Sequence, residues 1–275
     1  MRGRLWISAL ALSAGVCSVS MADVTGKAVL NGPAPKPKPI NMAAVPQCAG
    51  HPQAFDEGIV AGAKGELKNV VVYVKDGAKL GGEVPKQAVV IDQKNCVYTP
   101  HVVTVMVGQE LKAKNSDDFL HNVHGLAKDN GEFNFPQQTA GQENKIDGTK
   151  APETYKVKCD VHPWMAAWVV VLDHPYSAVT GDDGEFTLKG LKDGKHTLVA
   201  WQEKLGTKEA EVEVKDGKAV APIEFKFEPK KPKADAGAVP GVTPVLATST
   251  KAAAEETCPE CEKAAAKVEA KVAAK

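Results

Sequence analysis

The segment Cys159-Asp160-Val161-His162-Pro163-Trp164-Met165 constrains this chain more than any other, because it places a thiol, an imidazole and a thioether on one short loop. The loop follows Tyr155 to Lys158, whose alternation of apolar and polar residues predicts a strand. Zinc sites favour sets richer in Cys or His and rarely include Met, whereas copper that cycles between Cu(I) and Cu(II) uses this mixture. The loop therefore predicts three copper ligands, Cys159, His162 and Met165.

Such a site needs a second imidazole, and Phe119-Leu120-His121-Asn122-Val123-His124 supplies two candidates after another strand-like run. The two segments together resemble those of the cupredoxins, most closely the amicyanins, which also carry a His-Asn-Val-His stretch and a Cys-x2-His-Pro-aromatic-Met loop. The resemblance covers residues 102–172. It implies that His121 is the ligand and that His124 lies outside the metal site.

A structural interpretation competes with the metal site. A lone Cys159 near His162 is typical of a buried thiol beside a polar loop, and Met165 next to Trp164 is typical of an apolar core. The occurrence of these residue types together, at these spacings and at strand ends, favours the metal site. For His124 taken alone, the structural interpretation is the better one.

The cupredoxin resemblance implies a role for each residue of the site. Four residues would hold one type 1 copper: His121, Cys159, His162 and Met165. In this set Cys159 is the thiolate, and Met165 is a weak axial sulfur that tunes the reduction potential. Asn122 lies where cupredoxins have an Asn that ties the two ligand loops together, and Asn115 matches another polar position, so both are expected to support the ligands.

The ligand loop also suggests where electrons enter. We expect His162 to expose the edge of its imidazole, with Pro163 and Trp164 forming an apolar rim around it. A redox partner could dock on that rim and exclude water. The alternative is that Trp164 packs against a second domain.

The first residues show a pattern typical of a secretory signal peptide. Arg2 and Arg4 form a basic region, Leu5 to Val19 an apolar core, and Ser20-Met21-Ala22 a cleavage site with small residues on either side of Met21. The apolar run is too short and interrupted for a membrane span. We therefore expect residues 1–22 to be removed and the mature protein to be periplasmic or secreted.

Charge and cysteine content bear on the possible ligands and on the disulfide bonds of the chain. Both arginines leave with the signal peptide, and the mature chain is nearly neutral, which argues against nucleic-acid binding. Of the six cysteines, one leaves with the signal peptide, Cys159 is assigned to the metal and two form a Cys-x-x-Cys in the C-terminal tail. Cys48 and Cys96 remain, and in an exported protein they are expected to form a disulfide, with two separate buried thiols as the alternative.

Strand and turn signals predict an all-β protein with two sandwiches. The expected parts are a signal peptide (1–22), an N-terminal strand with a Pro-rich strap (23–68), a cupredoxin-like Greek-key copper domain (69–172), a second small β-sandwich (173–228) and a low-complexity tail (229–275). The tail is rich in Lys, Pro and Ala and is expected to be disordered. Its Cys258-Pro259-Glu260-Cys261 is more typical of a surface disulfide than of redox chemistry or a metal site.

The segments Val179 to Phe186 and Gly190 to Leu198 resemble the carboxypeptidase regulatory-like module, a small β-sandwich with a structural or partner-binding role. The module is short here. A missing strand is therefore expected from Val24 to Leu30 or from the cupredoxin sheet.

The expected function follows from the site as a whole. No general base or nucleophile accompanies the ligands, and the remaining histidines are scattered singly, so we expect no enzyme. We expect a blue-copper protein that carries single electrons, and the resemblance implies a c-type cytochrome or an amine dehydrogenase as its partner. Two alternatives remain open: a copper-binding or delivery protein without electron transfer, and a two-domain binding module whose copper site has degenerated.

Overall fold

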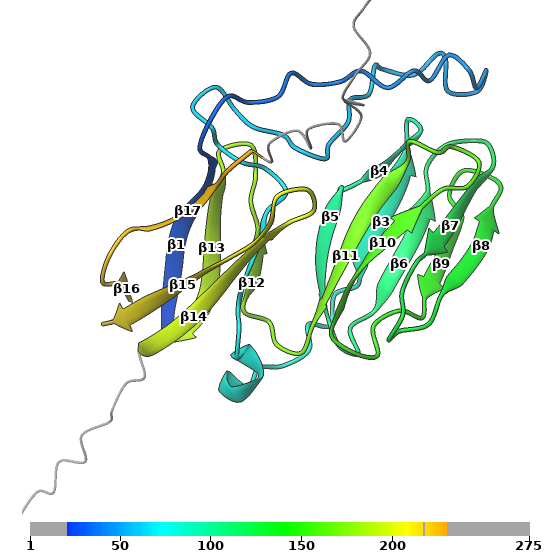
Figure 1. Cartoon of the computed structure of the whole chain (residues 1–275). Coiled ribbons are helices and arrows are strands. Elements are labelled where there is room, and N and C mark those ends of the chain that lie inside the picture. The colour runs from blue at the N-terminus through cyan, green and yellow to red at the C-terminus, as the bar shows by residue number, and fades with distance from the viewer. Residues whose placement is uncertain (1–20, 217, 230–275) are drawn as a thin grey trace, which may run out of the picture. The chain divides into compact units, whose positions relative to one another are not determined.

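The computed structural model describes residues 21–216 and 218–229. Residues 1–20 of the expected signal peptide, and the tail from residue 230 with its two cysteines, lie outside the described residues. The described part is built from strands and one short 3-10 helix, η1 (Gly77–Leu80), which confirms the all-β prediction (Figure 1). In this part of the chain, no helix is long and apolar enough to cross a membrane.

The predicted metal loop belongs to a sandwich of two sheets. The first sheet contains, in order, β5 (Val102–Met106), β11 (Ala166–Leu172), β10 (Glu153–Lys158), β7 (His121–Gly125) and β8 (Phe133–Gln137). The second contains β4 (Val97–Thr99), β3 (Val89–Lys94), β6 (Leu111–Asn115) and β9 (Glu143–Ile146). Alternate side chains of both sheets meet in one buried apolar cluster that includes Ile91, Leu111, Val157 and Val169. This core fixes the strands whose ends carry the site.

A second sandwich is formed by two further sheets. One has the order β13 (Glu185–Lys192), β1 (Met21–Leu30) and β17 (Ile223–Phe227). The other has the order β12 (Ser177–Val179), β2 (Val71–Val74), β14 (Gly194–Gln202), β15 (Gly206–Lys215) and β16 (Lys218–Ala219). The two sheets share an apolar cluster that includes Val72, Leu188, Leu198 and Phe227. The resemblance of this sandwich to carboxypeptidase regulatory-like modules stays a prediction.

The placement of β2 differs from the expected boundary of the copper domain at residue 69. β2 pairs with β12 and β14 in the second sandwich, with Val72 opposite Ala178 and Ala200. The first sandwich therefore begins at β3, and β1 and β2 both complete the second one. The sequence of β2 predicts a buried strand correctly, but a run of valines carries no information about which sheet the strand joins.

A long connection without named strands links β1 to β2 (Figure 1). Residues 40–55 of this connection, which we call the cover, fold back on themselves through a hydrogen bond of 2.9 Å from the Ile40 N–H to the Ala54 carbonyl. A disulfide between Cys48 and Cys96 joins the cover to the turn between β3 and β4. The cover is therefore attached to the site-bearing sandwich close to one end of its strands.

Candidate metal centre

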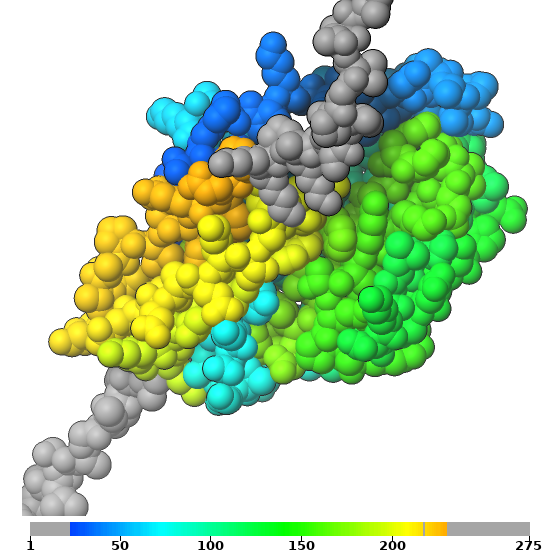
Figure 2. Space-filling model, in the orientation of Figure 1, coloured from blue at the N-terminus to red at the C-terminus, as the bar shows by residue number. Residues whose placement is uncertain are grey.

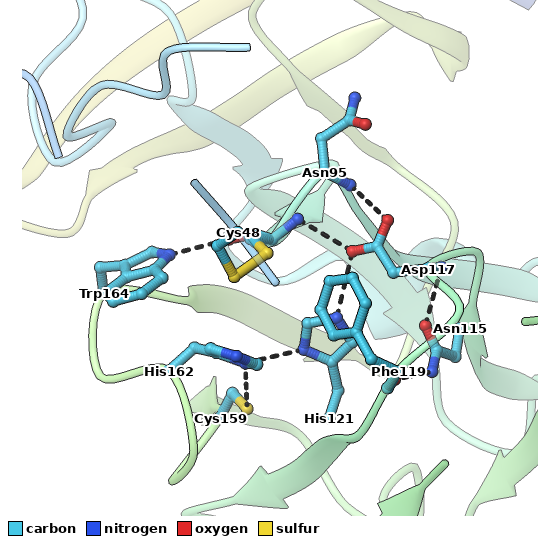
Figure 3. The surroundings of a disulfide bond; sticks show 10 residues. Cys48, Asn95, Asn115, Asp117, Phe119, His121, Cys159, His162 and Trp164 are labelled. Atoms are coloured by element: carbon cyan, nitrogen blue, oxygen red, sulfur yellow. Dashed lines mark hydrogen bonds and ion pairs between the residues drawn. A yellow bond between two sulfur atoms is a disulfide. The ribbon is translucent and has the colours of Figure 1, made fainter. Parts of the chain in front are cut away.

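Three of the predicted ligands lie together at one end of the first sandwich. His121 opens β7, while Cys159 and His162 lie on the loop between β10 and β11. One ligand atom from each residue lies within 4.8 Å of the others. The Nδ1 atoms of the two imidazoles are 2.9 Å apart, and the Cys159 Sγ is 3.5 Å from Nδ1 of His162 (Figure 3).

Strand pairing explains why these residues meet. β7 and β10 are antiparallel neighbours, with His124 opposite Lys158, so the start of β7 lies beside the residue that follows β10. Two backbone hydrogen bonds then close the loop: Met165 N–H donates to His162 at 2.9 Å, and Cys159 N–H donates to Met165 at 3.1 Å. The loop is therefore held by its own backbone hydrogen bonds, as a preorganised site requires.

Met165 lies at the end of this loop and is buried in the same apolar cluster as Cys159. This environment suits a thioether ligand and an ordinary core residue equally well. The role of Met165 as the axial ligand therefore stays a prediction.

Asn122 links the two ligand segments. Its backbone N–H donates to the Cys159 sulfur at 3.5 Å. Its side-chain oxygen accepts a 2.6 Å hydrogen bond from the Asp160 N–H, and its Nδ2 donates to the Asp160 carboxylate at 2.9 Å. Asn122 therefore holds the start of β7 against the loop that carries Cys159, in the position expected for a residue that orients ligands.

Asn115 acts at a greater distance from the ligands. Its Nδ2 donates to the Phe119 carbonyl at 3.0 Å, and its Oδ1 accepts from the Asp117 N–H at 2.9 Å. These bonds shape the turn between β6 and β7 that leads into His121. Asn115 therefore supports the segment that carries the ligand without contacting the ligand atoms.

Asp117 contacts the predicted ligand His121 and was not among the residues predicted from the sequence. Its Oδ2 lies 3.1 Å from Nε2 of His121, on the side of the ring opposite the ligand atom Nδ1. The same carboxylate accepts hydrogen bonds from the N–H groups of Asn95 at 2.7 Å and Cys96 at 2.9 Å (Figure 3). Asn95 and Cys96 both have positive φ, 56° and 59°, so the turn between β3 and β4 presents two successive N–H groups to the anion. The only available signal was the spacing of four residues between Asp117 and His121.

The electrostatics of the cluster favour a thiolate. Burial of Cys159 raises its pKa, but hydrogen bonds with His121, His162 and the Asn122 N–H outweigh burial and lower the pKa of the thiol from 9.0 to about 6. Burial also opposes charge on His121, yet its contacts with Asp117 and Cys159 raise the pKa of this imidazole above its usual 6.5. Metal binding at the cluster therefore competes with protonation of His121, while the sulfur ionises readily.

His124 lies outside the cluster of ligand atoms, and the expectation that it binds no metal stays a prediction. Its Nδ1 lies 2.9 Å from the Asp160 carboxylate, and its Nε2 lies 2.8 Å from Glu132. Both ring nitrogens therefore have partners on the sandwich surface, and hydrogen bonds with carboxylates raise the pKa of His124.

The prediction that His162 exposes its imidazole edge is wrong, because the residue is 1% exposed. The apolar rim that Pro163 and Trp164 were expected to form around His162 is also not as predicted. Pro163 is exposed, but Trp164 is half-buried, packs against the apolar residues of the cover and donates from Nε1 to the Cys96 carbonyl at 2.9 Å. Trp164 is thus a packing residue, and its partner is the cover, a segment far away in the sequence that no local pattern could reveal.

The chemistry of the donor set fits copper. Two imidazole nitrogens and one ionisable sulfur converge, and the two Nδ1 atoms lie 2.9 Å apart in the same buried cluster. A thiolate with two imidazoles is the donor set of mononuclear blue-copper sites, and zinc would favour additional Cys or His ligands. Among the described residues, this cluster is the one group of His, Cys and acidic side chains close enough to hold a metal ion.

Comparison with known proteins gave similar solved structures only. No protein-family model and no curated protein matches the chain. A reduced Cu(I) form of an amicyanin mutant is 29% identical and covers 33% of this chain and 87% of its own, with a TM-score of 0.28. A purple cupredoxin from Nitrosopumilus maritimus is 23% identical over 32% of this chain and 100% of its own, with a TM-score of 0.27.

A copper-containing nitrite reductase from Thermus scotoductus is 17% identical and covers 53% of this chain and 28% of its own, with a TM-score of 0.30. These structural neighbours are cupredoxins or copper proteins. At such TM-scores the likeness carries no argument about the function of this chain, which depends on the geometry of its own site.

Proposed function

We propose that this protein binds one copper ion and carries single electrons between redox partners. The observation that supports the proposal is the convergence of the ligand atoms of His121, Cys159 and His162 within 4.8 Å in a buried site. When bound there, copper would supply reversible one-electron chemistry between Cu(I) and Cu(II). We propose His121, Cys159, His162 and Met165 as its ligands.

The surrounding residues have roles that suit electron transfer. Asn122 and Asp117 hold the ligands from outside, so the site changes little in shape when its charge changes. Burial excludes water from the cluster. The disulfide and the signal-like first residues support an exported protein, periplasmic or secreted.

The rival function is copper delivery to another protein. A delivery site has to exchange its ligands with a partner, which is easier when at least one ligand is exposed. His121, Cys159 and His162 are each at most 1% exposed, and this burial favours electron transfer over delivery. We therefore propose a carrier without enzymatic activity, with a redox protein such as a c-type cytochrome or a dehydrogenase as its partner.

Repeated reduction and oxidation of the copper-loaded protein tests this function. The purified mature protein is loaded with one equivalent of Cu(II), reduced with ascorbate and reoxidised with ferricyanide, in the presence of a Cu(I) chelator. We expect the visible thiolate band to disappear and return over several cycles with the copper retained. Transfer of copper to the chelator at the first reduction would indicate delivery, and a protein that binds no copper would contradict both functions.

A further inference from the structure

The cover lies outside the two histidine ligands. Two aromatic rings contact the imidazoles: Phe119, with ring centroids 5.0 Å from His121 and 6.1 Å from His162, and Trp164, 5.5 Å from His162. Phe119 and Trp164 pack in turn against an apolar cluster of the cover that includes Met42. The rings of Phe119 and Trp164 thus form a layer between the ligands and the cover.

The cover is a fixed part of the structure. Cys48 and Cys96, which anchor it, are both 0% exposed, so an external thiol cannot approach their sulfurs in the folded protein. Within the cover, the Gln53 side chain donates to the carbonyl groups of Ile40 and Ala54 at 2.9 and 2.7 Å. A partner that exchanges electrons with His162 from this side therefore meets the cover first.

The cover has an unusual surface composition. Residues 40–55 contain no Asp, Glu, Lys or Arg, although these residues make up 25% of the whole chain. Its exposed residues are small, amide or apolar: Asn41, Ala43, Ala44, Pro46, Gln47, Ala49, Gly50, Pro52, Gln53 and Phe55. Depletion of charge is one of the compositional marks of the centre of a protein–protein interface.

A short bonded route connects the cover with the metal site. Nε2 of His121 lies 3.1 Å from Asp117, the same carboxylate oxygen accepts from the Cys96 N–H at 2.9 Å, and Cys96 is covalently joined to Cys48 of the cover (Figure 3). An electron that arrives at the cover therefore has a continuous path of covalent and hydrogen bonds to a ligand ring.

We propose that the outer surface of the cover is the docking face for the redox partner, a protein that presents an uncharged surface around its own cofactor. This inference rests on the proposed function. It moves the docking face from the copper loop, whose histidine is buried, to a segment outside the strands that carry the ligands. Association at an uncharged face depends little on ionic strength, in contrast to docking between charged patches.

The first test needs no copper. Diethyl pyrocarbonate acylates accessible imidazoles, and peptide mapping measures the rate at each histidine of the metal-free protein. We expect His162 to react as slowly as His174, a buried histidine between β11 and β12, because the cover closes over His162. Acylation of His162 at least ten times faster than that of His174 would overturn the inference, whether or not the protein binds copper.

The second test measures electron self-exchange between copies of the protein, with Cu(I) and Cu(II) forms mixed and the rate taken from NMR line broadening. Gln47→Glu places a charge on each cover, so repulsion should slow exchange at least tenfold at low salt and added salt should restore it. Gln87→Glu is the control, because exposed Gln87 precedes β3, at the opposite end of that strand from Cys96.

Each outcome of the second test decides between docking faces. An unchanged rate in Gln47→Glu, with the visible band retained, would overturn the inference. So would a larger loss of rate in Val161→Glu, because Val161 is 44% exposed on the copper loop itself. A protein that takes up no copper contradicts the proposed function instead, and the acylation test still decides whether the cover closes the site.

Discussion

Substitution of Asp117 by Asn tests the link between the disulfide turn and the metal site. In the wild type, the carboxylate accepts hydrogen bonds from the N–H groups of Asn95 and Cys96 and contacts His121. The Asn side chain has nearly the same shape, but it offers one oxygen and one NH2 group. It can satisfy one backbone donor and must turn its own donor toward the other.

The expected cost follows from these contacts. A hydrogen bond to a charged group contributes about 1.5–3 kcal/mol, and a buried donor left without an acceptor costs about 1–3 kcal/mol. Because Asp117 is only 5% exposed, water cannot easily replace the lost acceptor. We expect Asp117→Asn to lower the free energy of unfolding of the metal-free protein by about 2–4 kcal/mol.

The loss of stability in Asp117→Asn should also depend on pH. Contacts with His121, Cys96 and Asn95 outweigh burial and hold the pKa of Asp117 in the folded protein below its usual 3.8. The stability that the Asp117 carboxylate contributes is therefore present above pH 3.8 and is lost as the pH falls through the lower pKa of the folded protein. The pKa of His121 is raised above 6.5, so its contribution is present below pH 6.5 and is lost as the pH rises through the folded value. The difference in the free energy of unfolding between the wild type and Asp117→Asn should therefore be largest between about pH 4 and 6.5.

Urea denaturation of the metal-free proteins across this pH range measures the effect. Asp118→Asn is the matched control, because the neighbouring Asp118 is exposed, and we expect it to change stability by no more than about 0.5 kcal/mol. Equal stability of Asp117→Asn and wild type near pH 5.5 would refute the structural role given to this carboxylate.

Three further predictions concern the remaining residues of the site. His124→Ala should retain copper, because both nitrogens of this ring are bonded to surface carboxylates, and metal analysis after dialysis checks this. Met165→Leu should keep the visible thiolate band and raise the reduction potential, measured by voltammetry, whereas an unchanged potential would exclude a sulfur–copper contact. Cys48 and Cys96 should appear as one linked peptide in mass spectrometry without reduction, and recovery of two free thiols would contradict the anchored cover.

Local patterns were sufficient for the parts of the site that are close together in the sequence. Cys159, His162 and Met165 lie on one loop that follows a recognisable strand, so their proximity could be predicted from the sequence, whereas the choice of His121 rested on the resemblance to the cupredoxins. Several strands of both sandwiches were recognisable in the same way, since alternation of apolar residues reports burial on one face of a sheet.

Contacts between distant segments could not be predicted in this way. The valines of β2 report burial but not a partner, and the strand joined the second sandwich instead of the first. The positions of the cover and of Asp117 could not be predicted for the same reason. Their positions depend on a disulfide and on the turn between β3 and β4, which bring residues 48, 96 and 117 together. The apolar residues of the cover, such as Met42, do not indicate in the sequence which segment they pack against.

The central claim is that Cys159 binds copper as a thiolate together with His121 and His162. Its most direct test is the visible and paramagnetic-resonance spectrum of the copper-loaded wild type beside that of Cys159→Ser. We expect the wild type to show an intense visible band from sulfur-to-copper charge transfer, with a narrow copper hyperfine splitting, and the variant to lose both. A wild type without this band, or a variant that keeps it, would contradict the claim.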